Sequence, residues 1–321
     1  MNLDTFSVFL TVVEEMNFTR AAERLHFSQQ ALSGYIRRME EHYGVTLFQR
    51  RPTLKLTAEG EAMVSCARQL LDSESVLTRR LADITQNATA TMTFGISYQR
   101  NGAFFPGIWN QFHTMHPNIS VKVFEHVTSS LLVELQHNRI DLMVGLDIAE
   151  TSNLTILPLV EEHMRCVLSE SLLRRIYPND WERLLAVFHE QGVDLTMLRD
   201  APLLLLPERN RIRAAVDQIF LKNRILPNVV LECSHQNVLF HAACCANGVA
   251  VINPISIYQE LRQYQELPPR CHSFPVRDAP VNTVSLAFRK DISQPQYVLD
   301  LAHCVQEEFQ YYAKILEEHK L

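Results

Sequence analysis

The stretch that decides the fold of the N-terminal part is TRAAERLHFSQQALSGYIRRMEEHYG, residues 19–44. Apolar residues recur at helical spacing on both sides of a break before Ser28, which predicts two short helices joined by a tight turn. Ser28 is placed to cap the second helix, because its hydroxyl can accept a hydrogen bond from a backbone N–H at the helix start. Leu32, Ile36 and Met39 form the apolar stripe of that helix, which we expect to be buried. The pattern predicts a helix-turn-helix.

The face of the second helix opposite this stripe carries Gln29, Gln30, Ser33 and Arg37. Glutamine can pair with adenine, arginine with guanine, and serine with either base, at the edges of the major groove. Any amphipathic helix also has a polar outer face, and for this helix alone that plainer interpretation is the stronger one. The flanking sequence must decide between the two.

The sequence after this helix favours DNA binding. Tyr43-Gly44 is a helix stop, and residues 47–56, LFQRRPTLKL, predict a β-hairpin "wing" with cations at its tip, suited to phosphate or minor-groove contact. The chain has a formal net charge of −6, yet between Arg37 and Lys55 five basic residues stand against two acidic ones. A basic patch on an acidic protein is typical of a small DNA-binding module attached to a larger sensor.

Four motifs in this order resemble a known family. They are Ala21-Ala22-x-x-Leu25, Ser28-Gln29-x-Ala31-Leu32-Ser33, Gly44-x-x-Leu47-Phe48-x-Arg50 and Leu56-Thr57-x-x-Gly60. Their spacing within residues 1–90 is similar to that of the LysR-type transcriptional regulators. The resemblance implies a winged helix-turn-helix DNA-binding domain over residues 1–58. In it Gln29, Gln30, Ser33 and Arg37 would face the groove, while Ser28, Arg50 and Arg51 would approach phosphates. We also expect Tyr35 and Arg38 of the same helix to bind DNA.

Two residues of the second helix depart from what the family leads us to expect. Gly34 lies inside the helix, where glycine costs about 1 kcal/mol relative to alanine, although it lets the backbone approach DNA closely. Tyr35 is bulkier than expected, so the base preference of relatives does not transfer to this chain.

A long helix is predicted from Thr57 to about residue 85. Its apolar residues follow a seven-residue spacing interrupted by Glu74, and we expect them to form a dimerisation seam: Met63, Ala67, Leu70, Leu77, Leu81 and Ile84. Such a repeat buries its stripe against a second copy of the helix; the alternative is packing against the chain's own domain. A dimer is favoured because paired winged helices contact two half-sites of DNA. We assign residues 59–90 to this linker and its hinge, with the hinge at 86–91.

Beyond the hinge, strand-like and helical runs alternate, which predicts an α/β arrangement with parallel strands. The expected strands are 93–98, 120–125, 141–145, 165–168, 202–206, 229–232, 249–252 and 283–288, followed by a terminal helical region at 294–320. The family resemblance continues at residues 141–145 and 247–254. It implies an effector-binding domain over 91–321 with two periplasmic-binding-protein-like lobes, 91–163 plus 274–321 and 164–273. We place the crossings between lobes near 163–166 and 267–273, and expect an added helix in the long segment 172–192.

In such folds ligands bind at the C-terminal ends of strands, facing helix N-termini. The residues expected there are Ser97, Tyr98, Gln99, Arg100, Thr128, Ser129 and His235, followed by Gln236, with Pro207, Glu208, Arg209 and Asn253 on the opposite wall. Hydroxyls and helix N-termini favour an anion, and Arg100 or Arg209 could balance its charge, so we expect a carboxylate effector. The alternative is that the serine and threonine hydroxyls only cap helices.

The composition and the absence of certain motifs limit which other classes of protein this chain is expected to belong to. With 47% hydrophobic and 21% charged residues the chain is expected to be globular and soluble, and no apolar run approaches the ~18 residues of a membrane span. Seven cysteines without a framework spacing and the absence of a signal peptide predict a cytoplasmic protein. His113 and His116 lack a third metal ligand, and Cys244-Cys245 are expected to be small buried residues. We expect no metal, no cofactor and no enzymatic activity.

The resemblance implies a homodimer or homotetramer that binds double-stranded promoter DNA, and that contacts RNA polymerase if it is an activator. A small-molecule effector would change the geometry of the oligomer or the bend of the DNA. Three alternatives stay open: a DNA-binding regulator without a ligand, a stand-alone small-molecule-binding protein, and an enzyme with an accessory DNA-binding segment.

Overall fold

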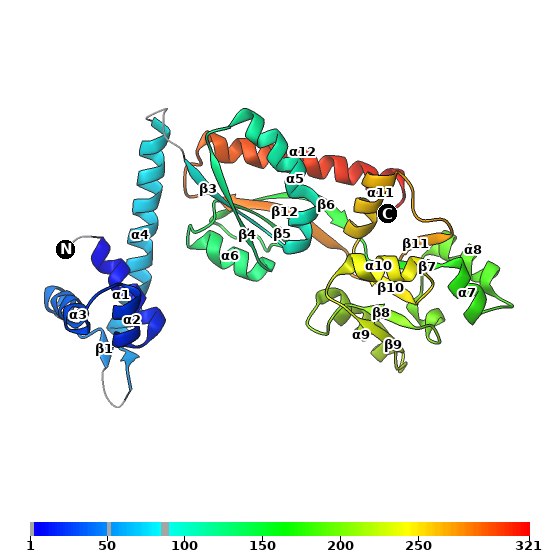
Figure 1. The fold of residues 1–321 in the computed structure, drawn as a ribbon, viewed down its shortest axis with the longest axis horizontal. Helices are drawn as coiled ribbons and strands as arrows, with labels where there is room; N and C mark the ends of the chain where they lie inside the picture. The colour runs from blue at the N-terminus through cyan, green and yellow to red at the C-terminus, as the bar shows by residue number, and fades with distance from the viewer. Residues whose placement is uncertain (1–2, 50–52, 85–89) are drawn as a thin grey trace. The chain divides into compact units, whose positions relative to one another are not determined.

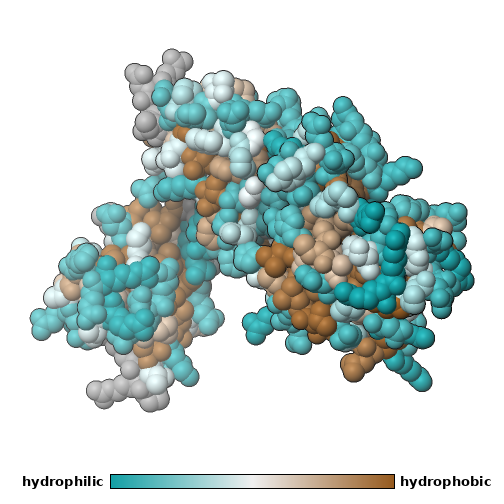
Figure 2. Space-filling model, turned by 45° about the vertical axis from the view of Figure 1, so that its right-hand side comes forward, coloured by the Kyte–Doolittle hydropathy of each residue, from teal (hydrophilic) through white to brown (hydrophobic). Residues whose placement is uncertain are grey.

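The computed structural model describes residues 3–49, 53–84 and 90–321. By its internal contacts the chain divides into two compact units: residues 1–92 with the short stretches 118–122 and 133–140, and the remainder, which holds most of the two larger sheets. The N-terminal helices and the sheets are described separately (Figure 1). The surface visible in Figure 2 is mostly hydrophilic, with its hydrophobic residues gathered in separate patches. The predicted hinge lies mostly outside the described residues, because only Ala90 and Thr91 of that segment belong to them.

The N-terminal unit is a bundle of short helices with a small hairpin. Its elements are α1 (Asp4–Glu15), α2 (Phe18–Arg24), α3 (Gln29–Tyr43), β1 (Phe48–Gln49), β2 (Lys55–Leu56) and α4 (Ala58–Ile84). The predicted stripe Leu32, Ile36 and Met39 is fully buried in one core with Phe9 and Val12 of α1. The helix-turn-helix and its hairpin are therefore confirmed, with α2 starting after Asn17, whose side chain accepts from two backbone N–H groups.

Helix α4 is as long as predicted, and its seam divides into two parts. Ala67 is fully buried and Met63 half-buried against the core of the N-terminal unit. Leu70, Leu77 and Leu81 are 44, 56 and 54% exposed, while the side chain of Ile84 lies outside the described residues. The first members of the heptad thus pack on the chain's own domain, and the later ones face away from that core.

The first of the two larger sheets has the strand order β4-β3-β5-β12-β6. Its strands are β3 (Thr91–Ile96), β4 (Ser120–Glu125), β5 (Leu142–Leu146), β6 (Leu154–Glu162) and β12 (Asn282–Arg289). The helices between and after them are α5 (Tyr98–Met115), α6 (Thr128–Gln136) and α12 (Gln296–Glu318). Helix α12 contacts α5, β6 and β12, so the end of the chain closes the first lobe.

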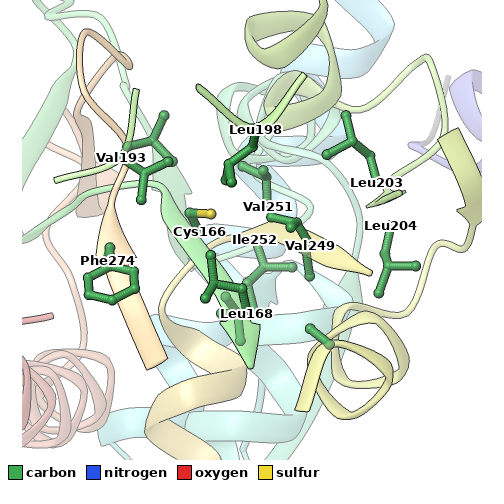
Figure 3. Packing of buried hydrophobic residues seen from close by; sticks show 14 of the residues in the cluster. Cys166, Leu168, Val193, Leu198, Leu203, Leu204, Val249, Val251, Ile252 and Phe274 are labelled. Carbon is green, nitrogen blue, oxygen red and sulfur yellow. The ribbon is translucent and has the colours of Figure 1, made fainter. Parts of the chain in front are cut away.

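The second sheet has the order β11-β7-β10-β8-β9. Its strands are β7 (Arg165–Ser169), β8 (Leu203–Leu205), β9 (Val229–Glu232), β10 (Val249–Ile252) and β11 (Cys271–Pro275). Figure 3 shows apolar side chains of β7, β8, β10 and β11 packed together in its core. Its helices are α7 (Glu170–Ile176), α8 (Trp181–Gln191), the short η1 (Leu195–Leu198), α9 (Arg211–Lys222), α10 (Gln236–Cys244) and α11 (Ile255–Tyr264). The long segment 172–192, where an added helix was expected, contains most of α7 and all of α8.

The prediction of parallel strands was right for only part of each sheet. β3 pairs in parallel with β5, and β8 with both β9 and β10, but β12 is antiparallel to β5 and β6, and β7 to β10 and β11. Parallel neighbours need a long crossover, usually a helix. β7 and β12 instead arrive directly from the other sheet, so they run against their neighbours.

The chain crosses to the second sheet near the predicted place, but it returns later than predicted. β6 ends at Glu162 in the first sheet and β7 begins at Arg165 in the second. On the return, β11 still pairs with β7 from Cys271↔Ser169 to Pro275↔Arg165. The crossing therefore lies after Pro275, and the lobe boundary drawn between residues 273 and 274 falls inside β11. The predicted crossing at 267–273 instead leads into β11, an additional edge strand of the second sheet.

Candidate nucleic-acid interface and effector site

The outward face of α3 presents the predicted DNA-binding side chains together. Gln29, Gln30 and Arg37 are exposed and Ser33 is half-buried, whereas the stripe on the opposite face is fully buried. Ser28 caps the helix as predicted, since its Oγ accepts from the backbone N–H of Ala31 at 3.1 Å.

The neighbouring residues Arg37 and Arg38 of α3 contact different side chains. The Arg37 Nε donates to Glu41 Oε1 at 2.7 Å, one turn further along the helix. The Arg38 guanidinium instead lies 4.7 Å from the ring centre of Tyr35, whose other neighbour is the ring of Phe27, stacked at 5.5 Å. Tyr35 is thus the middle of a stack of side chains on the surface of the helix-turn-helix.

The wing is a two-stranded antiparallel hairpin with Phe48 opposite Leu56 and Gln49 opposite Lys55. Arg50 and Arg51, both predicted to contact DNA, lie outside the described residues. Their contribution stays a prediction.

Sequence reasoning missed the residues that fix the wing. Glu40 Oε1 accepts from the backbone N–H of Leu47 at 2.8 Å, which ties the hairpin to α3. Thr57 Oγ1 donates to the carbonyl of Thr46 and accepts from the N–H of Gly60, which ties it to α4. A Cβ at Gly60 would lie 2.2 Å from the Leu47 carbonyl oxygen, so glycine permits this close approach. The signal was present in the motif Leu56-Thr57-x-x-Gly60, which was used only as a family marker.

A network of three side-chain amides joins the two lobes of the larger unit. Gln99 Oε1 accepts from both Gln236 Nε2 and Asn253 Nδ2 at 3.0 Å, and Gln236 Oε1 accepts from the backbone N–H of Asn253 at 2.8 Å. Gln99 lies at the start of α5, Gln236 at the start of α10, and Asn253 directly follows β10. Strand ends and helix N-termini of both lobes therefore meet here, as the predicted effector site requires.

Residues around this network hold several polar groups. Ser97 precedes α5, but its hydroxyl makes no capping bond, and its buried Oγ has no hydrogen-bond partner within the part of the chain that the structure describes. Tyr98 is 68% exposed, with its ring 6.3 Å from that of His235. The capping alternative is therefore wrong for Ser97.

The other predicted effector residues are more scattered. Thr128 Oγ1 accepts from the N–H of Leu146 at 3.0 Å, so its hydroxyl joins α6 to β5, and Ser129 beside it is exposed. Glu208 and Arg209 are exposed and Pro207 is half-buried, all in the turn between β8 and α9. Of the two predicted counter-charges, only Arg209 lies on the surface.

The expectation that Arg100 balances the effector's charge was wrong. Arg100 is 4% exposed, and its Nη2 donates to Glu162 Oε2 at 2.5 Å. The Tyr312 hydroxyl donates to the other Glu162 oxygen at 3.1 Å, and burial beside this carboxylate raises the pKa of Tyr312 well above its ordinary value. Arg100 directly follows Gln99 in α5, yet its side chain lies in the core of the first lobe.

Two further links between the lobes were not predicted. Arg211 Nη2 contacts Asp147 Oδ2 at 2.5 Å, while Asp147 Oδ1 accepts from the backbone N–H of Thr283. Arg262 Nη1 contacts Glu308 Oε1 at 2.5 Å. Beside that pair, burial and the carboxylate raise the pKa of Tyr258 to about 12. These partners are far apart in sequence, so no local pattern could have found them.

The described residues offer little support for a metal site, a membrane-spanning helix or a reactive cysteine. They contain no His, Cys, Asp and Glu grouping suited to a metal ion, and none of their helices is long and apolar enough to cross a membrane. Burial and the hydrogen bond that the Cys271 thiol shares with Cys244 as donor raise the pKa of Cys271, which disfavours the thiolate that redox chemistry needs. A cavity of about 330 Å³ lies beside α10 and α11, lined by residues such as His241, Glu260 and Tyr264; it contains none of the predicted effector residues.

The fold and the two sites define a DNA-binding regulator with a ligand-binding domain. The family model for the bacterial regulatory helix-turn-helix protein of the lysR family matches residues 3–61, and that for the LysR substrate binding domain matches residues 86–310. The chain belongs to the LysR family of transcriptional regulators. The predicted family, the fold class and the regulatory function are thereby confirmed.

Individual relatives are similar to this chain over most of its length. An uncharacterized HTH-type transcriptional regulator, YcgK of Bacillus subtilis, is 26% identical over 258 residues, which cover 78% of this chain and 79% of the relative. The regulator BenM of Acinetobacter baylyi is 26% identical over 268 residues, 78% of this chain and 80% of BenM. A full-length OxyR variant from Pseudomonas aeruginosa shares the fold with a TM-score of 0.60, 22% identity and 95% of each chain covered.

Proposed function

We propose that this regulator binds double-stranded promoter DNA as a homodimer or homotetramer, through Ser28, Gln29, Gln30, Ser33, Tyr35, Arg37 and Arg38 of α3 and the wing arginines Arg50 and Arg51. The outward polar face of α3 supports this assignment, because it stands opposite a fully buried stripe. A related regulator of the same fold, CbnR, has been solved in complex with its target DNA. As an activator the protein would also contact RNA polymerase. Its place of action is the cytoplasm, and it has no enzymatic activity.

Assembly through α4 is the second part of the proposal. Leu70 and Leu77 lie seven residues apart on α4 and are about half exposed. A seven-residue apolar repeat is typical of helices that pair with each other. Since a single winged helix contacts too little DNA to be selective, pairing of α4 would place two recognition helices on successive half-sites.

The effector is proposed to bind beside the amide network of Gln99, Gln236 and Asn253. The N-termini of α5 and α10 both reach this point, and helix N-termini attract anions. The buried Ser97 hydroxyl, which has no hydrogen-bond partner among the described residues, is the observation that carries the ligand proposal, because buried polar groups in proteins are nearly always hydrogen-bonded. A small carboxylate would accept bonds from Ser97 and the amides, with Arg209 on the opposite side. Such a ligand shifts the protein only if it binds two lobe arrangements unequally.

A second candidate is a DNA-binding regulator without a ligand. It is favoured by the closure of the amide network, since the three side chains already satisfy much of each other's hydrogen-bonding capacity. In that case the lobes would serve only in assembly.

Two measurements test the proposal. Selection of binding sites from random duplex DNA should enrich an inverted repeat, bound with a steep salt dependence; no enrichment would refute sequence-specific binding. In a thermal-shift screen, a small carboxylic acid should raise the melting temperature, and the shift should be lost in Ser97→Ala and kept in Ser171→Ala, a variant of an exposed serine outside the predicted site. A shift that both variants keep would place the ligand elsewhere. The absence of any stabilising acid would favour the regulator without a carboxylate effector.

A further inference from the structure

The middle of the outward face of α3 has no side chain. Residues three and four positions apart share a helix face, so Gln30 precedes Gly34 on this face and Arg37 and Arg38 follow it. A Cβ at Gly34 would meet nothing closer than Arg38 Nη1, at 3.9 Å, which is ordinary contact. The fold therefore does not need glycine at this position, although glycine weakens a helix.

The charges of Arg37 and Arg38 point in opposite directions along the helix. Arg37 is paired with Glu41, so its guanidinium lies toward the C-terminal end. Arg38 lies against the ring of Tyr35 and within contact of the Gly34 position, so its guanidinium lies toward the N-terminal end. In helix-turn-helix proteins it is the N-terminal part of the recognition helix that reaches the base edges.

The position of Arg38 is held by a stack. Phe27, which precedes the helix, lies parallel to Tyr35 with an interplanar angle of 15°, and Arg38 covers the tyrosine ring. A flat guanidinium on an aromatic ring loses less freedom when it binds than a free arginine does. Arg37, in contrast, must leave Glu41 or carry that carboxylate toward the DNA, where its charge repels phosphate.

We propose that Arg38, held by Tyr35 above the side-chain-free Gly34, is the residue of α3 that reads a guanine, and that Gly34 lets the helix backbone approach the groove closely. Arg37 then contributes charge without base preference. This inference rests on the proposed binding of DNA through α3, and it assigns different roles to residues that the sequence had grouped together.

Base-substitution binding assays test the assignment of Arg38. After site selection with the wild-type protein, dissociation constants are measured for the selected duplex and for single-base variants of it, at one salt concentration. Arg38→Ala should lose preference for a guanine by about tenfold or more, and Tyr35→Leu should lose part of it while Tyr35→Phe keeps it. Arg37→Ala should weaken binding to all duplexes by a similar factor. Unchanged guanine preference in Arg38→Ala, or its loss in Arg37→Ala, overturns the assignment.

Gly34 is tested against a matched glycine elsewhere in the chain. Gly102 also lies inside a long helix, α5, with nothing within 4 Å of an added Cβ. Gly34→Ala and Gly102→Ala should both raise the melting temperature, but only Gly34→Ala should weaken binding to the selected duplex. Equal DNA binding by both variants overturns the close approach at Gly34. A wild-type protein that selects no sequence would instead refute the proposed DNA-binding function itself.

Discussion

The winged helix-turn-helix and the lobed domain differ in how far apart in the sequence the residues lie that hold each of them together internally. In the first, the hydrogen bonds that fix the recognition helix and wing join residues 3 to 11 positions apart, such as Glu40 with Leu47. In the second, Gln99 bonds to Asn253 across 154 positions and Arg100 to Glu162 across 62. Local contacts fix α3 and the wing, whereas the contacts of Gln99 join elements of two lobes that lie far apart in sequence. Under the proposed function, the first set of contacts keeps a DNA-binding surface fixed, and the second is a link between lobes that a ligand would replace.

The largest change in stability is expected at the buried ion pair of Arg100 and Glu162 in the lobed domain. Arg100→Met leaves the Glu162 carboxylate buried without its partner, which should lower the free energy of unfolding of the lobed domain by about 3–5 kcal/mol. Chemical denaturation followed by circular dichroism measures the loss. The double variant Arg100→Met/Glu162→Gln should recover much of it. A loss below about 1 kcal/mol in the single variant would contradict the pairing.

The next effect is expected in the N-terminal unit. Gly60→Ala places a Cβ against the Leu47 carbonyl oxygen, so backbone must shift at a cost of about 1–3 kcal/mol. The wing should move and DNA affinity fall, while the lobed domain keeps its melting transition. Differential scanning calorimetry and a DNA-binding titration check both parts. Gly102→Ala is the control, and equal behaviour of the two variants would refute the close contact.

Alkaline pH should weaken the lobed domain rather than the N-terminal core. Burial raises the pKa of Cys166 from 9.0 to about 12. Because the folded thiol holds its proton more tightly than the unfolded one, its contribution is complete below pH 9 and is lost as the pH rises from 9 toward 12. At pH 10 the loss is about 1 kcal/mol. Unfolding followed between pH 8 and 10 measures it, and Cys166→Ala should remove this part of the slope; an unchanged slope would contradict the assignment.

The smallest effect is expected at Arg211. Its pair with Asp147 is largely exposed, so Arg211→Ala should change the free energy of unfolding by about 0.5 kcal/mol or less. The variant should nevertheless shift the proposed effector's apparent affinity, because the pair joins the two lobes. Matched titrations of wild type, Arg211→Ala and the exposed, same-lobe Arg183→Ala would show it. Identical affinities would mean that this ion pair does not influence lobe closure.

Much of the N-terminal unit could be predicted from the sequence because its determinants are local. The cap at Ser28, the buried stripe of α3, the stop at Gly44 and the hairpin all follow from side chains a few residues apart, and each is confirmed. Most strands of the lobes were also predicted, because short apolar runs are a local signal, but β6 and β11 were missed. The parallel direction was wrong for several strand pairs, because direction depends on where the chain crosses between sheets.

The sequence by itself determined the class of this protein: a capped recognition helix, a wing and a long helix ahead of an α/β domain. Only the tertiary structure decided that Arg100 is buried on Glu162, that Gln99 meets Asn253, and that Arg38 lies against Tyr35 while Arg37 lies against Glu41. The physical reason is that periodicity and capping act within a few turns of chain. The environment of a charged or amide side chain depends on which distant element packs beside it and on which rotamer that packing allows.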